Sequence, residues 1–237
     1  EFVASLNYGR GASRSVVEAW DKFSEAMSEY FPYSPGVCRY PGPLQASPSQ
    51  PFYLDKNKEV KRRAARYNTN DLQWTKAYSE GKEISGWDSG LLLKCFKGFV
   101  EIYEEGIKIL KNCHLNNAEE YEGMAGMLRI AEIQVSMVNS MINFINFINL
   151  RDGLDAGESY EAWVEIRAVC EKELKNAGKS LELCKADSNL GFSCEGQGTV
   201  RGGYFTPYTI QNKLDELMVT IDEIDLVLNQ KYYSHIK

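Results

Sequence analysis

The feature that most constrains the fold is an unbroken helical periodicity in the middle of the chain. In the segment 124–145, apolar residues recur at alternating steps of four and three residues, which is the spacing of one face of an α-helix. A second apolar row over 127–148 widens this stripe. A helix that is apolar over so much of its circumference lies centrally, with neighbours on more than one side. We therefore expect Leu128, Val135 and Ile142 to be nearly fully buried.

Four other segments have the same amphipathic periodicity, namely 16–27, 88–112, 163–184 and 210–228. Ser13 or Ser15 is expected to cap the first of them, and Pro32 to end it. The pair Asp155 and Glu158 has the spacing of a capping box for the helix over 163–184. Thr206 and Pro207 are expected at the cap and the first turn of the last helix.

These periodicities predict an all-α fold. Weaker helical patterns at 56–66 and 71–81 add to the five strong ones, and no alternating strand pattern is longer than about four residues. Short links between consecutive helices favour an antiparallel bundle of five to seven helices in a single domain, 1–237. Because the chain opens with Glu1-Phe2 and not with Met, we expect it to be a fragment of a larger or processed protein.

Two stretches do not fit the helical pattern and are where function is expected. Six of the seven prolines and several aromatic residues fall within 32–55, and five glycines fall within 187–206. Prolines at this density exclude an α-helix, and long segments inside compact domains are often functional. The sequence thus predicts an ordered Pro-rich loop, with aromatic rings exposed on the bundle surface, and a Gly-rich loop.

Charge and cysteine usage narrow the possible partners. The net charge of −6 disfavours a nucleic-acid partner, although 56–66 holds six bases and predicts either a local basic patch or a solvated helix face. No membrane is expected either, because the most apolar segment, 137–150, is interrupted by four asparagines. The six cysteines have no CxxC or zinc spacing, which favours a reducing, cytoplasmic compartment over secretion.

Residue patterns for catalysis and for cofactors are weak throughout. His114 and His235 have no second ligand nearby in the sequence, so we expect no metal site. The glycines of 196–202 have the spacing GxGxxxG, which does not match a nucleotide-binding motif, and no cofactor is expected. No acid pair for glycoside hydrolysis can be nominated, so no catalytic residue is assigned. The asparagines at 139, 143 and 146 share one helix face; they can bond sugar hydroxyls, or form a polar stripe toward solvent or a neighbouring helix.

Two passages resemble a helical domain of bacterial carbohydrate-active enzymes. The first is Val17-Glu-Ala-Trp-Asp-Lys-Phe-Ser-Glu-Ala26, followed by Tyr30-Phe-Pro32 and Tyr40-Pro-Gly-Pro-Leu44. The second is Asp187-Ser-Asn-Leu-Gly-Phe192, followed by Tyr204-Phe-Thr-Pro207 and Ile210-Gln-Asn-Lys-Leu214. They lie near the two ends of the chain, so the resemblance covers most of it. It implies an α-helical region C-terminal to the catalytic barrel of large glycoside hydrolases related to alpha-glucuronidases and hexosaminidases.

The resemblance implies an accessory domain that buttresses an upstream catalytic domain and lines its substrate cleft. The chain alone is then expected to have no glycosidase activity. Aromatic side chains stack on sugar rings and Arg side chains bond their hydroxyls, so the candidate carbohydrate-binding residues are Arg39, Tyr40, Trp74, Trp87, Arg201 and Tyr204. Each of these also fits a core or interface position. The alternatives are a helix-bundle scaffold that binds a protein partner and an autonomous carbohydrate-binding module.

Overall fold

The fold was derived from a computed structural model that describes residues 1–31, 44–56, 89–155, 157, 159–191 and 205–233. Among these residues all regular structure is helical, and none lies in a strand, which confirms the all-α prediction for this part of the chain. The α-helices are α1 (Phe2–Glu25), α4 (Ser89–Lys111), α5 (Ala118–Gly153), α6 (Tyr160–Ala186) and α7 (Pro207–Leu228). Short helical turns occupy η1 (Ala26–Tyr30), η2 (Leu44–Ser49) and η3 (Asn229–Tyr233). Apart from Lys56, the weaker helices predicted at 56–66 and 71–81 lie outside the described residues.

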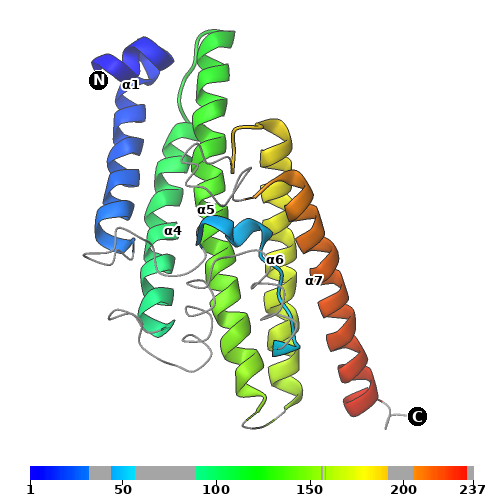
Figure 1. Cartoon of the computed structure of the whole chain (residues 1–237). Helices are drawn as coiled ribbons and strands as arrows, with labels where there is room; N and C mark the ends of the chain where they lie inside the picture. The colour runs from blue at the N-terminus through cyan, green and yellow to red at the C-terminus, as the bar shows by residue number, and fades with distance from the viewer. Residues whose placement is uncertain (32–43, 57–88, 156, 158, 192–204, 234–237) are drawn as a thin grey trace, which may run out of the picture.

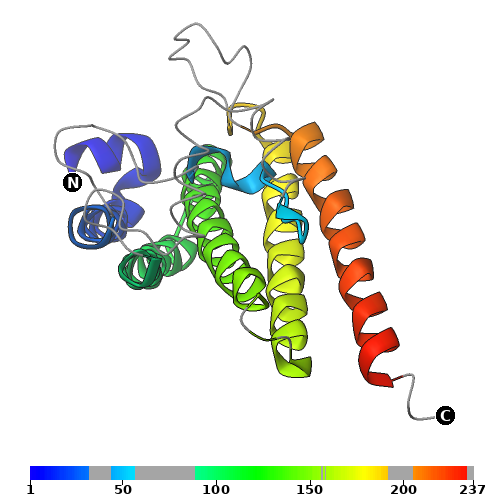
Figure 2. The ribbon, with the colours of Figure 1, turned by 60° about the horizontal axis from the view of Figure 1, so that its bottom comes forward.

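Consecutive α-helices pack side by side and run in opposite directions. Figure 1 shows α1, α4, α5, α6 and α7 in that order across the molecule, and the contacts between neighbours agree with this order. In Figure 2, α5, α6 and α7 form a row, with the segment that begins at η2 lying against it. The described helices are not long and apolar enough for any of them to cross a membrane.

The predicted central position of α5 is confirmed by its contacts with α1, α4, α6 and η2. Each of the three hydrophobic clusters of the core includes α5 side chains. Val135 is buried as expected, but Leu128 and Ile142 are only partly buried, so that prediction was wrong for them. Ile130, from the second apolar row, is 54% exposed. The apolar rows of α5 therefore extend over more of the helix surface than its neighbouring helices cover.

The first helix begins earlier than predicted. α1 starts at Phe2, so neither Ser13 nor Ser15 caps it; Ser13 instead donates to the carbonyl of Arg10 within the helix. The helix is interrupted at Gly9, whose φ of 80° suits glycine and where a Cβ atom would lie 2.2 Å from a Glu120 oxygen. The helical conformation ends at Tyr30, and Phe31 is extended, as expected for a residue before proline.

The Trp and Phe of the first resembling passage are packing residues. The Trp20 ring nitrogen donates to the Met127 sulfur at 3.3 Å. Phe23 stacks on Tyr103 of α4 with ring centroids 4.3 Å apart, and Gly106 leaves room for its ring. This passage therefore attaches α1 to α4 and α5.

Some of the predicted helix ends and caps agree with the structure, and one does not. The helix expected at 88–112 spans 89–111. Thr206 caps α7 in a capping box with Thr209, and Pro207 occupies the first turn, both as predicted. The capping box predicted at Asp155 was wrong, because Ser159 caps α6 by accepting from the Ala162 amide.

Candidate functional site

Residues 44–56, which we call the strap, are the described part of the predicted Pro-rich loop. The strap begins with the η2 turn, which contains Pro48, and η2 packs on α5, α6 and α7. A 3-10 turn in this segment departs from the irregular loop expected from its prolines. Proline remains compatible with short helical turns, because its fixed φ matches their geometry.

The aromatic side chains of the strap face the core. Phe52 is 1% exposed and Tyr53 is 4% exposed. The Phe52 ring lies 5.8 Å from the Phe144 ring and 4.9 Å from the Phe147 ring, centroid to centroid. The expectation that aromatic rings of this loop are exposed was therefore wrong for both residues. Apolar rings in a segment of this composition gain more from burial against α5 than from contact with solvent.

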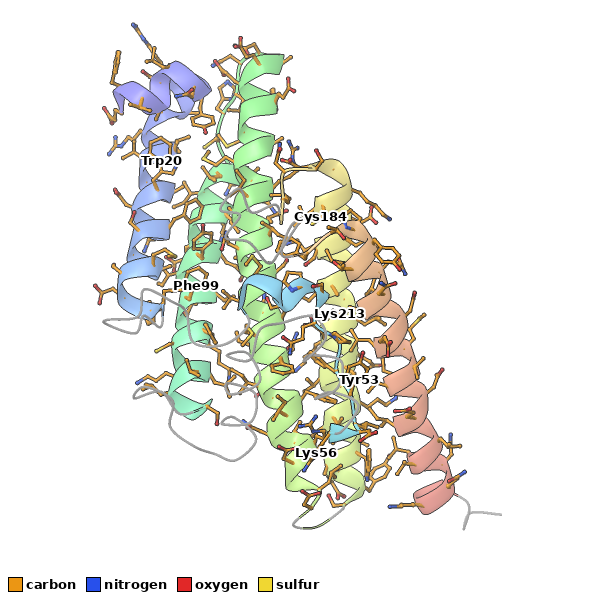
Figure 3. The ribbon with its side chains drawn as sticks, viewed as in Figure 1. Trp20, Tyr53, Lys56, Phe99, Cys184 and Lys213 are labelled. Atoms are coloured by element: carbon orange, nitrogen blue, oxygen red, sulfur yellow. The ribbon has the colours of Figure 1, made fainter. Side chains whose placement is uncertain are left out.

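A polar cluster beneath the strap consists of Lys213, Glu173, Ser140, Asn143 and Asn176. The Lys213 and Glu173 side chains form an ion pair and are both completely buried. Lys213 Nζ also donates to the Ser47 carbonyl at 2.8 Å and lies 5.4 Å from the Phe52 ring centre. Figure 3 shows Lys213 on α7, close to the strap. Burial lowers the pKa of Lys213, and the nearby Glu173 carboxylate opposes that effect.

Both carboxylate oxygens of Glu173 are occupied by donors from α5. Ser140 Oγ donates to Oε1 at 2.6 Å, and Asn143 Nδ2 donates to Oε2 at 2.8 Å. Asn176 Nδ2 in turn donates to Ser140 Oγ and to the Ser136 carbonyl, each at 2.9 Å. A carboxylate with its oxygens engaged in this way has a positioning role and does not point at an external substrate.

Side chains from α5 and α7 also bind the strap directly. Thr220 Oγ1 donates to the Phe52 carbonyl at 2.8 Å, and Arg151 Nη1 donates to the Tyr53 carbonyl at 3.0 Å. The Ser47 hydroxyl donates to the Met137 carbonyl at 2.8 Å. Buried main-chain carbonyls outside regular structure need such partners, so these bonds fix the path of the strap across the helices.

The Gln50 side chain, unlike the other polar groups of the strap described above, takes no part in the hydrogen bonds between the strap and the helices. This side chain is 3% exposed, and neither its nitrogen nor its oxygen has a hydrogen-bond partner among the residues that the structure describes. A buried amide without partners costs about 1–3 kcal/mol of stability. The strap therefore carries a local energetic cost at this position.

Cys170 and Cys184, the buried cysteines of α6, lack the features of reactive thiols. Burial raises the pKa of the Cys170 thiol to about 12 and that of the Cys184 thiol to about 11. Cys170 lies on the same helix as Glu173, whose charge raises the pKa further. A thiol with such a pKa stays protonated near neutral pH and acts as a small apolar side chain.

The two ends of the Gly-rich stretch meet. Gly191 has a φ of 78°, and a Cβ atom there would lie 2.4 Å from the Phe205 carbonyl oxygen. Phe205 packs in a cluster with Ile133 and Ile210, and Met137, whose carbonyl binds the strap, packs against the same cluster. The Gly-rich stretch thus leaves and re-enters the helical array near the beginning of the strap.

All of the predicted carbohydrate-binding residues lie outside the described residues. They are Arg39, Tyr40, Trp74, Trp87, Arg201 and Tyr204. Of the predicted asparagine row, Asn143 faces α6 and binds Glu173, which agrees with the alternative of a polar stripe toward a neighbouring helix. Among the residues that the structure describes, no group of three or more metal-ligating side chains could hold an ion.

Lys213 and Glu173 were not predicted as a pair from the sequence. A signal was present, since both lie among apolar positions of their helices: Lys213 stands between Ile210 and Leu217, and Glu173 follows Cys170. A charge inside an apolar stripe indicates a buried ion pair when a second stripe contains the opposite charge.

Comparisons with protein-family models, with curated proteins and with solved structures each found no match.

Proposed function

We propose that this chain is an accessory helical domain of a carbohydrate-processing enzyme, which buttresses a catalytic barrel of the same polypeptide and contributes to its substrate cleft. One observation carries the proposal: a buried contact joins the second passage that resembles such domains to the strap, which begins at the last residue of the first passage. The first passage ends where the strap begins, and Lys213 of the second passage donates to the Ser47 carbonyl of the strap. The end of the first passage, Leu44, and the second passage are thereby held close together although they are distant in the sequence.

The way these passages are held favours a scaffold. Trp20, Phe23 and Lys213, which belong to the quoted motifs, serve in packing or in the polar cluster. Buried contacts of this kind fix the helices in place, and fixed helices position the loops that connect them. Binding residues are commonly found on loops that a rigid scaffold positions in this way. We propose that the complete domain holds five to seven helices, with the Pro-rich and Gly-rich stretches as its ordered loops.

Two of the candidate sugar-binding residues are close in sequence to the strap or to the start of α7. Tyr204 directly precedes Phe205, and Tyr40 comes four residues before Leu44. Four residues span at most about 14 Å, so Tyr40 stays within reach of the strap. In the proposed role, these two aromatic rings stack on a sugar bound mainly by the catalytic domain.

The decisive experiment uses the full-length protein encoded by the complete reading frame. We expect a catalytic barrel upstream of this chain and glycoside hydrolysis that Tyr40→Ala and Tyr204→Ala weaken through a higher KM. Tyr121→Ala is the control, because Tyr121 lies on α5 and is 60% exposed. A complete reading frame without a catalytic domain would refute the proposal.

Sugar titrations of the isolated chain, followed by Tyr and Trp fluorescence, separate the remaining alternatives. An accessory domain should give flat titrations or affinities no better than about millimolar. Saturable micromolar binding that Tyr40→Ala abolishes would identify an autonomous carbohydrate-binding module instead. Release of reducing sugar by the isolated chain, lost on substitution of one Asp or Glu, would make the chain itself the enzyme.

A further inference from the structure

The helices hold the strap through contacts to its main chain. Arg151, Lys213 and Thr220 each donate from a helix to a main-chain carbonyl of the strap, at 3.0, 2.8 and 2.8 Å respectively. A bond to a carbonyl does not depend on the side chain of the residue that accepts it. The three donors are therefore able to hold any peptide segment that presents carbonyls at the same positions.

The Phe52 side chain adds a contact that does depend on residue type. Its ring is 1% exposed, lies next to the rings of Phe144 and Phe147, and is 5.4 Å from Lys213 Nζ. The helix side chains that hold the strap, which we call the strap site, are Phe144, Phe147, Arg151, Lys213 and Thr220. Donors to main-chain carbonyls, together with a place for one large side chain, are the features with which proteins recognise peptide segments.

Release of the strap would leave the helices intact and relieve two costs of burial. The hydrogen bonds between the strap and the helices use side chains, so the main-chain bonds within α5 and α7 do not depend on the strap. Lys213 and Glu173 are both completely buried, and charges that return to water regain their hydration. The Gln50 side chain would gain water as a partner. Burial of the Phe52 ring opposes release.

The last residue of the strap is attached by exposed charges. Lys56 Nζ lies 2.6 Å from the Asp155 carboxylate and 3.2 Å from the Asp152 carboxylate, and the Asp155 side chain is 75% exposed. Figure 3 shows Tyr53 and Lys56 further along the strap from Lys213. Exposed ion pairs contribute little stability and are screened by salt. This attachment therefore weakens as the salt concentration rises.

We propose that the strap is a releasable occupant of the strap site, and that the vacated site binds a peptide segment of a partner protein with an aromatic residue in the place of Phe52. The strap is then an autoinhibitory contact, because the partner segment has to displace it. The chemistry of this partner follows from the contacts of the strap itself. The inference does not depend on the carbohydrate function.

Hydrogen exchange of the wild-type protein tests the release of the strap. The main-chain N–H of Gln50 lies in the strap, and that of Ile145 lies in the buried part of α5. We expect the Gln50 N–H to be at least about a hundredfold less protected than the Ile145 N–H, and less protected still at high salt. Equal protection and equal urea dependence would show that the strap opens only when the whole protein unfolds, which would overturn the proposal.

A labelled peptide with the sequence of residues 44–56 tests binding to the full chain. The chain variant Phe52→Ala loosens the resident strap and leaves the strap site unchanged. In fluorescence anisotropy, this variant should bind the peptide at least about tenfold more tightly than the wild-type chain does, because its site is vacant more often. A matched peptide that itself carries Phe52→Ala should bind the same variant about tenfold or more weakly.

Further chain variants locate the binding. Thr220→Val, added to Phe52→Ala, removes one donor and should weaken the peptide by about threefold or more. Tyr121→Ala is the control that should bind as the wild type does, because Tyr121 lies on α5 and is 60% exposed. If circular dichroism shows that Phe52→Ala does not fold, Lys56→Ala, which loosens only the exposed end of the strap, takes its place. A folded variant that fails to bind the peptide, or equal affinity for the two peptides, would overturn the proposal.

Discussion

Replacing Lys213 by Met removes the cation from a site where both charges are completely buried. The Glu173 carboxylate then keeps its bonds to Ser140 and Asn143 but loses its counter-charge. The Ser47 carbonyl loses its lysine donor at the same time. Methionine has a similar length and an apolar tip, so the substitution removes the charge with little change in side-chain volume.

The expected cost follows from these contacts. Removing one partner of a buried ion pair costs about 3–5 kcal/mol, because the remaining charge is left uncompensated. The matched double variant, Lys213→Met with Glu173→Gln, removes both charges and keeps a side-chain oxygen that Ser140 or Asn143 can bond. We expect its loss to be about 2 kcal/mol smaller than the sum of the losses of Lys213→Met and Glu173→Gln measured singly, since coupled pairs deviate from additivity by amounts of this size.

Urea unfolding followed by circular dichroism measures these free energies, and hydrogen exchange reports on the strap. The main-chain N–H of Gln50 donates to the Ser47 carbonyl, and its hydrogen exchange should accelerate in Lys213→Met because the strap loses the lysine that holds it. A loss below about 1 kcal/mol in the single variant, or additive losses in the double variant, would refute the inference that the pair acts as a coupled unit. Unchanged exchange at Gln50 would refute its role in holding the strap.

Three further predictions follow from burial. Ile145→Ala, at a fully buried position, should cost about 2–5 kcal/mol in urea unfolding, and Ile142→Ala clearly less, because Ile142 is only partly buried; equal losses would contradict the observed orientation of α5. The pKa of Cys170 is raised from 9.0 to about 12, so the folded state keeps a proton that the unfolded state loses, and stability falls as the pH rises above 9. Between about pH 8 and 10, the wild-type protein should therefore lose about 1.4 kcal/mol more than Cys170→Ala, and parallel pH profiles would contradict the raised pKa. Gln50→Met should raise the free energy of unfolding by about 1 kcal/mol by removing a buried amide without partners, and a destabilised variant would contradict that assignment.

Helical periodicity predicted the described α-helices well, because each buries a continuous stripe on its neighbours. The boundaries were most accurate where local chemistry is decisive, as at Thr206 and Pro207. They failed where two local signals competed: Ser159 caps α6 although Asp155 had the spacing of a capping box. At the start of α1, the residues before Gly9 are also helical. The apolar periodicity did not predict them, because the helix is interrupted at Gly9.

Periodicity also gives the direction of a side chain without showing what covers it. Leu128 and Ile142 lie on the predicted apolar row, yet both keep some exposure because the neighbouring helices do not enclose α5 completely. Phe52 and Tyr53 illustrate the opposite case. Composition suggested exposed rings in a Pro-rich loop, and the structure buries them, since the strap crosses helices that are distant in the sequence.

The polar cluster was the part of the site least accessible to sequence reasoning, and its physical role explains why. Apolar residues at Lys213 and Glu173 would fill similar space, often at equal or greater stability. An apolar pair would not, however, distinguish one strap register from another, because burial of apolar surface is non-directional. The Lys213 ammonium binds the Ser47 carbonyl and the Glu173 carboxylate together, and this geometry is met when the strap lies at one position on α7. That fixed register determines the position of the strap on α7, and with it the position of Leu44, the first described residue of the strap.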